Sequence, residues 1–227
     1  MNQPQQHLPL HPEPAYPVYA RSERVADAAM HVLGLAGALS GTIWLIVWAW
    51  SRVGGAHTLA LSVYGATLVA GFAASGIYHF TPWERLRPVF RRLDHAAIYL
   101  KIAGTYTPLV VMAGSLSSYL VLATVWGLAA LGMTRKLFFW TNPNRNGIGL
   151  YLLMGWLSVL LIGSLAAILP VAALVLIAVG GLLYTVGVVF HTWESLRFSN
   201  AIWHGFVVSA SACFFIAIAL GVAAHGA

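Results

Sequence analysis

The chain has 227 residues, of which 59% are hydrophobic and only 8% are charged. A soluble globular domain carries about 25% charged residues, so this composition excludes that class and indicates an integral membrane protein. The net charge of +6 requires no nucleic acid partner, because most basic residues flank apolar segments, where anionic lipid headgroups attract them. The single cysteine, Cys213, excludes a disulfide framework and a cysteine-based zinc site.

The chain divides into a polar tail and a long apolar region. Residues 1–20 are rich in Pro and Gln, which predicts a disordered cytoplasmic tail rather than a cleaved signal peptide. Residues 21–227 are expected to form one all-α membrane domain. A membrane-spanning helix needs about 20 apolar residues. Seven segments meet this requirement, namely 27–50, 57–79, 94–113, 115–134, 148–167, 170–192 and 201–223.

Basic residues gather at one end of the predicted seven-helix bundle. Ten of the twelve Lys and Arg residues flank the same helix ends, whereas Arg52 lies at the opposite end and Lys101 lies inside a span. The ten are Arg21, Arg24, Arg85, Arg87, Arg91, Arg92, Arg135, Lys136, Arg145 and Arg197. Loops with an excess of basic residues face the cytoplasm. We therefore expect a cytoplasmic N-terminus and an external C-terminus, the reverse of G-protein-coupled receptors.

Histidines and aspartates from five predicted spans lie at a similar depth near this basic end. They are Asp27, His31, His79, Asp94, His95, His191 and His204. Each histidine alone is explained by a ring that reaches the headgroup region. Ionisable groups at membrane depth, however, usually face the bundle interior and have a partner there. Their convergence favours a shared site, and imidazoles with a carboxylate suit zinc.

Two further polar residues lie on the same spans. Ser75 precedes His79 by one helical turn and shares its face, so it is either a site residue or an ordinary packing hydroxyl. Lys101 follows Asp94 by about two turns. It either reaches toward the site as a charge partner or extends toward the cytoplasmic interface, and both alternatives stay open at this point.

Four motifs follow one another along the chain: SGIYHF at Ser75–Phe80, LDHAAIYLKIAGTYTP at Leu93–Pro108, GGLLYTVGVVF at Gly180–Phe190 and NAIWHGFV at Asn200–Val207. Together they resemble the haemolysin III family, the bacterial branch of the progestin and adiponectin receptor superfamily. Glu23–His31 is also similar to the family's first motif, with Asp27 in place of an Asn. The resemblance covers about residues 21–223. It implies a seven-helix protein of the bacterial plasma (inner) membrane with a cytoplasmic N-terminus.

The resemblance further implies a zinc ion near the cytoplasmic face. The family's Ser-x3-His motif assigns one ligand to His79, and the second position of a His-x3-His motif assigns another to His204. The first position of that motif holds Asn200, which is a poor zinc ligand. We therefore expect His191 as the third ligand, with His31 or Asp94 as the alternatives.

Two classes of function follow from these patterns. The superfamily resembles alkaline ceramidases in its site chemistry, which implies a zinc-dependent hydrolase of a lipid amide or ester. Asp94 would then accept a proton from the zinc-activated water, and Ser75 would stabilise the water or the developing oxyanion. The alternative is a non-enzymatic protein with structural metal or none, either a lipid-homeostasis regulator, a receptor-like protein or a pore-forming haemolysin. Membrane lipid is the expected partner, and the sequence does not identify an oligomeric one.

Overall fold

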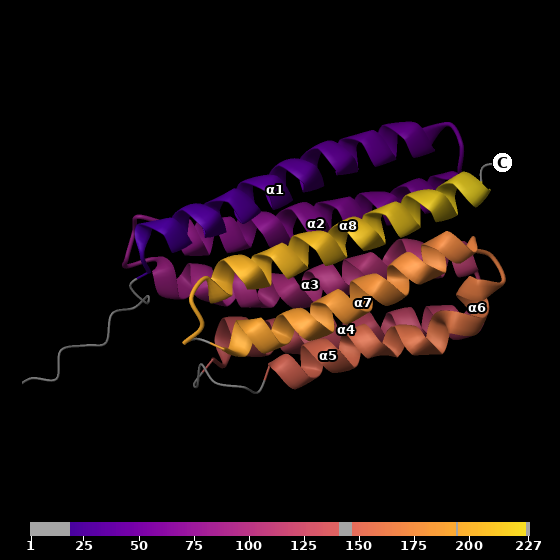
Figure 1. The fold of residues 1–227 in the computed structure, drawn as a ribbon. Helices are drawn as coiled ribbons and strands as arrows, with labels where there is room; N and C mark the ends of the chain where they lie inside the picture. Colours follow the sequence, from indigo (N-terminus) through magenta and orange to yellow (C-terminus); the bar gives the residue numbers. More distant parts are fainter. Residues whose placement is uncertain (1–18, 141–146, 194, 226–227) are drawn as a thin grey trace, which may run out of the picture.

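The fold is a bundle of antiparallel helices (Figure 1). The computed structural model describes residues 19–140, 147–193 and 195–225, so the predicted tail lies almost wholly outside the described residues. The helices are α1 (Arg21–Trp50), α2 (Gly55–Phe80), α3 (Arg87–Ala113), α4 (Leu116–Phe138), α5 (Ile148–Trp156), the short 3₁₀ helix η1 (Leu157–Leu161), α6 (Ile162–Ala166), α7 (Val171–Thr192) and α8 (Ser199–His225). Seven helical segments in this part of the chain are long and apolar enough to cross a membrane. The predicted seven-helix membrane fold is confirmed.

Helix α3 begins at Arg87, one to two turns before the apolar segment that predicted it. Arg87 is buried because its guanidinium donates hydrogen bonds to backbone carbonyl oxygens near the end of α2. It donates to the carbonyl oxygen of Tyr78 at 3.1 Å and to that of Thr81 at 2.8 Å, and it pairs with Glu84 at 2.7 Å. A charged residue thus belongs to the helix although hydropathy excludes it.

The fifth span is continuous in length but not in helix type. Residues Leu157–Leu161 wind as a 3₁₀ helix between α5 and α6. The Tyr106 hydroxyl of α3 lies 2.6 Å from the carbonyl oxygen of Met154 and 3.0 Å from that of Gly155. The Tyr106 hydroxyl thus donates a hydrogen bond to carbonyl oxygens that lie where the α-helical hydrogen bonding of α5 ends. The change in helix type therefore occurs where a neighbouring helix can satisfy the freed carbonyl groups.

Close packing brings α1 against α2 and α8. A Cβ added at Gly34 would lie 2.5 Å from a ring carbon of Phe72 on α2, so glycine is required for this approach. Gly37, one turn further along α1, has no such neighbour within 4 Å. The glycines of α1 therefore mark helix contact at some positions and not at others.

One end of the bundle collects the starts of α1, α3 and α8 and the ends of α2, α4 and α7, while α8 ends at the opposite end (Figure 1). Glu23 ties two of these elements together. Its carboxylate accepts the N–H of Phe198, just before α8, at 2.9 Å and the N–H of Ala20 at 2.9 Å. The first turns of α1 and α8 are thereby held side by side. That this end faces the cytoplasm stays a prediction.

Candidate metal centre

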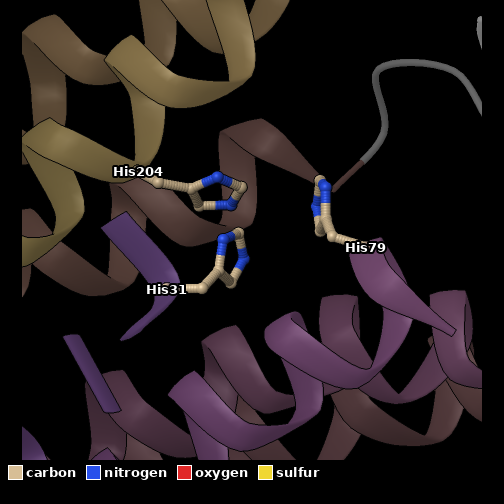
Figure 2. A group of neighbouring side chains, drawn as sticks. All are labelled: His31, His79 and His204. Carbon is tan, nitrogen blue, oxygen red and sulfur yellow. The ribbon is translucent and has the colours of Figure 1, made fainter. Parts of the chain in front are cut away.

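Three histidines from three helices lie together at the basic end of the bundle. Figure 2 shows the rings of His31 from α1, His79 from α2 and His204 from α8 turned toward a common space. One ligand nitrogen from each lies within 4.8 Å of the other two. The side chains are only 6%, 8% and 10% exposed, respectively, so the group is largely removed from solvent.

Asp27 joins the three histidines into one network. Its Oδ1 lies 2.6 Å from Nδ1 of His204, and its Oδ2 lies 3.3 Å from Nδ1 of His79. Its backbone carbonyl oxygen lies 2.8 Å from Nδ1 of His31, one helical turn further along α1. The same residue therefore contacts the δ-nitrogen of every ring in the group.

These contacts determine which nitrogen of each ring carries hydrogen. A carboxylate and a carbonyl oxygen only accept hydrogen bonds, so each Nδ1 must be the donor. In a neutral imidazole the lone pair is then on Nε2. Nε2 of His31 lies 3.2 Å from the Ser75 hydroxyl oxygen, and Nε2 of His204 lies 3.5 Å from the same atom. A hydroxyl donates only one hydrogen, so it satisfies at most one of these two acceptors at a time.

This donor set fits a zinc ion. Three imidazoles with Nε2 lone pairs suit tetrahedral zinc with a fourth position for water or substrate. Metal-binding histidines generally donate their second ring N–H to a carboxylate or a carbonyl, which orients the ring, and Asp27 supplies both kinds of acceptor. The residues His31, His79 and His204 would hold the ion, and Asp27 would orient them.

Asp94 and Ser75 lie beside this group. The Asp94 side chain is 14% exposed and interacts with the Ser75 hydroxyl, which in turn contacts His31 and His204. Ser75 is therefore the link between the Asp94 carboxylate of α3 and the histidines.

A narrow pocket lies beside Asp27 and His79, and Asn200 also lines it.

The structure favours His31 over His191 as the third histidine of the group. The His191 ring packs on Trp203 with a centroid separation of 5.0 Å. Trp203 precedes His204, and consecutive residues on a helix point about 100° apart. A residue of α7 that reaches Trp203 therefore lies beside a different face of α8 from the one that carries His204. His191 is not part of the described histidine group.

His95 and Lys101 of α3 are likewise not part of the described histidine group. The His95 ring packs edge-on against Trp140 at 4.7 Å. The Lys101 ammonium lies 4.5 Å from the ring centroid of Phe72 and 5.3 Å from that of Tyr184. Lys101 thus contacts aromatic rings inside the bundle and forms none of the described ion pairs.

Asp27 is the residue whose role sequence reasoning missed. It was expected at the right depth, but no function in the site was assigned to it. The available signals were its position one turn before His31 and its place in a motif where the resembled family has Asn.

The model of the family described as haemolysin-III related matches residues 19–215 of this chain. The chain belongs to this family. It is 36% identical over 198 residues to Hemolysin-3 of Bacillus cereus, covering 86% of this chain and 90% of that protein. It is 31% identical over 203 residues to the Hemolysin-3 homolog of Bacillus subtilis (strain 168), covering 88% and 95%, respectively.

The similarity extends to animal proteins over a shorter stretch of the chain. The chain is 32% identical over 164 residues to the monocyte to macrophage differentiation factor of Homo sapiens, covering 69% of this chain and 67% of that protein. These relatives support the expected membership of the progestin and adiponectin receptor superfamily. The family match includes Asp27, His31, His79 and His204.

Proposed function

We propose that this haemolysin III family protein is a zinc-dependent hydrolase that cleaves an amide or ester bond of a membrane lipid. The observation that carries the proposal is the histidine group itself. Asp27 accepts hydrogen bonds from the Nδ1–H groups of the rings. The Nε2 lone pairs of His31 and His204 share the Ser75 hydroxyl as their one donor. A cation satisfies this excess of acceptors better than Ser75 does alone.

Zinc bound by these residues supplies Lewis acidity and activates water for attack at neutral pH. The protein residues supply the remaining functions. Asp94 accepts the proton of the attacking water, because it is the carboxylate beside Ser75 and is mostly buried. Ser75 donates a hydrogen bond to the reacting oxygen, since its hydroxyl already points at the ring nitrogens of the site. Asp27 keeps the three rings oriented.

A lipid substrate follows from where the site lies. His31, His79 and His204 are on helices that are long and apolar enough to cross a membrane, within about three turns of the helix ends. A bond near the headgroup of a lipid lies at this depth. The similarity to Bacillus proteins supports residence in a bacterial plasma membrane.

The metal is tested by elemental analysis of the purified protein and four single variants. His31→Ala, His79→Ala and His204→Ala should each lose most of the zinc. His191→Ala is the matched control, because it removes a histidine from the same end of the bundle but outside the group. Zinc that persists in the first three variants, or that is lost only with His191→Ala, would contradict the ligand set.

The reaction is tested by release of free fatty acid from ceramide and phospholipid. Asp94→Asn should retain zinc and lose turnover. Equal rates in the parent and in Asp94→Asn would refute Asp94 as the proton acceptor. A zinc-loaded protein without turnover would instead support the alternative of a non-enzymatic regulator, receptor-like protein or haemolysin, in which the Asp27 network has a structural role.

A further inference from the structure

A second polar cluster lies at the same end of the bundle, between α3 and α4. Its centre is the indole of Trp140. The Lys136 ammonium lies 4.1 Å from the Trp140 ring centroid, and the Arg91 guanidinium carbon lies 5.4 Å from it. We call Arg91, Arg92, Arg135, Lys136 and Trp140 the basic cluster. Its cationic groups come from α3 and α4, and one from each helix, Arg91 and Lys136, lies near the Trp140 ring.

The basic cluster carries an excess of positive charge within the described part of the protein. The ion pairs found there involve Asp27, Glu84 and Asp94, and none includes a residue of the cluster. Arg91 and Arg135 both act electrostatically on Lys136, which means that like charges lie close together. Asp94 is the acidic residue that acts on Arg91, and it is already engaged with Ser75.

The Nε atom of Arg91 is buried and has no hydrogen-bond partner among the described residues. A buried donor without an acceptor is costly and usually indicates a missing partner. The position of Arg135 and Lys136 in the last turn of α4 is favourable for the helix dipole, and Arg92 donates to the carbonyl oxygen of Leu137 at 3.2 Å. Neither effect supplies an acceptor for Arg91, so an anion from outside the described residues is expected.

We propose that the basic cluster binds the phosphate of an anionic phospholipid headgroup. Guanidinium and ammonium groups are the side chains that recognise phosphate. Clusters of basic residues at the end of a membrane helix attract anionic lipids, and Trp is favoured at the headgroup level. The cluster shares no residue with the histidine group, so the lipid is proposed as a bound partner rather than as the hydrolysed substrate.

A lipid fits better than a soluble phosphate because apolar surface adjoins the cations. Phe138 and Phe139 stand between Lys136 and Trp140 in the chain and are 73% and 69% exposed. A lipid can meet both features of this helix end, because its phosphate pairs with the cations while its acyl chains contact exposed aromatic rings. The proposal therefore commits to a phospholipid.

The test uses the detergent-solubilised full-length protein. It measures Tm by thermal unfolding and lipid retention by native mass spectrometry. Phosphatidylglycerol should raise Tm and remain bound in the mass spectrum, whereas phosphatidylcholine and inorganic phosphate at the same concentration should do neither. The Arg91→Gln/Lys136→Gln double variant should bind phosphatidylglycerol about 30-fold more weakly, since each basic residue near a membrane surface contributes about fivefold. Arg85→Gln is the matched control, because Arg85 is an exposed arginine of the same end outside the cluster.

Retention of phosphatidylglycerol by the double variant at the parent's level would overturn the proposal. Equal stabilisation by phosphatidylcholine would also overturn it, and so would an equal effect of inorganic phosphate, which would identify a free anion as the ligand. If the double variant does not fold, the effect of phosphatidylglycerol on the Tm of the parent protein is compared at low and high salt concentration. The Debye length falls from about 10 Å at 0.1 M to about 3 Å at 1 M salt, so the phosphatidylglycerol effect should shrink markedly. A salt-independent effect would refute a charge-based site.

Discussion

Replacement of Asp27 should weaken zinc binding in a graded way. Asp27 is not a proposed zinc ligand, but its two carboxylate oxygens contact the Nδ1 atoms of His204 at 2.6 Å and His79 at 3.3 Å. An Asn keeps only one acceptor oxygen, and its NH₂ group would meet the N–H of the second ring. An Ala removes both acceptors. The two variants therefore differ in how many rings lose their orientation.

The magnitude follows from how many histidine rings are left without a carboxylate acceptor. Removal of a hydrogen-bond partner behind a metal ligand typically lowers metal affinity by about 10- to 100-fold, and a tenfold change corresponds to about 1.4 kcal/mol. We expect about tenfold for Asp27→Asn, because one ring is affected. We expect about 100-fold for Asp27→Ala, because both are affected.

Competition with a chromophoric chelator measures the zinc Kd of the detergent-solubilised protein at constant pH. Arg85→Gln is the control, because it also replaces a charged side chain with an amide, at an exposed position outside the site. Unchanged Kd values for both Asp27 variants would refute the orienting role, and so would weaker binding by the Asn variant than by the Ala variant.

The same assay tests whether Asp27 and Asn200 compensate for each other. Both residues line the pocket beside His79, and the resembled family has Asn and His at these two positions. The Asp27→Asn/Asn200→His double variant should therefore recover much of the affinity that Asp27→Asn loses. An additive or greater loss in the double variant would show that the two positions do not exchange roles.

The remaining predictions concern stability. Gly34→Ala should lower Tm, with an overpacking cost of about 1–3 kcal/mol, because its Cβ would lie 2.5 Å from a ring carbon of α2; Gly37→Ala, with open space around it, should leave Tm nearly unchanged. Glu23→Gln should lower both Tm and zinc retention, because the link between the starts of α1 and α8 weakens. The Arg87 guanidinium holds the pKa of Glu84 below its usual value near 4.5. The Glu84 ion pair therefore stabilises the fold above about pH 4.5, and its contribution to Tm should disappear at lower pH in the parent, whereas Glu84→Gln should lack this pH-dependent contribution.

The membrane class and the seven helices could be predicted from local properties of the chain. Length and hydropathy of a segment decide whether it can span a membrane, and neither depends on contacts with other segments. Local hydropathy misplaced several helix ends, since α1 begins at Arg21 and α4 ends at Phe138, and it gave no signal of the change in winding within the fifth span. Arg87 belongs to α3 although it is charged, because its guanidinium donates hydrogen bonds to carbonyl oxygens at the end of α2. The fifth span changes helix type where the Tyr106 hydroxyl donates to the carbonyl oxygen of Met154.

Position along a helix also determined the depth of each polar residue, which is why His79, His204, Ser75 and Asp94 could be proposed as one site before the fold was known. Depth is a coordinate along the helix axis. The direction in which a side chain points around that axis depends on how the helix is rotated against its neighbours, and the weakly amphipathic spans of this bundle carry little signal of that rotation.

Tertiary packing therefore decided which of these polar side chains meet. His31 and His191 lie at similar depth, yet α1 turns His31 toward His204 and α7 turns His191 toward Trp203. The role of Asp27 also required the fold, because its contacts with His79 and His204 join helices far apart in the chain. The sequence by itself determined the kind of protein and the depth of its polar residues, while only the packed bundle determined which of them meet, because helix rotation is fixed by contacts between distant segments.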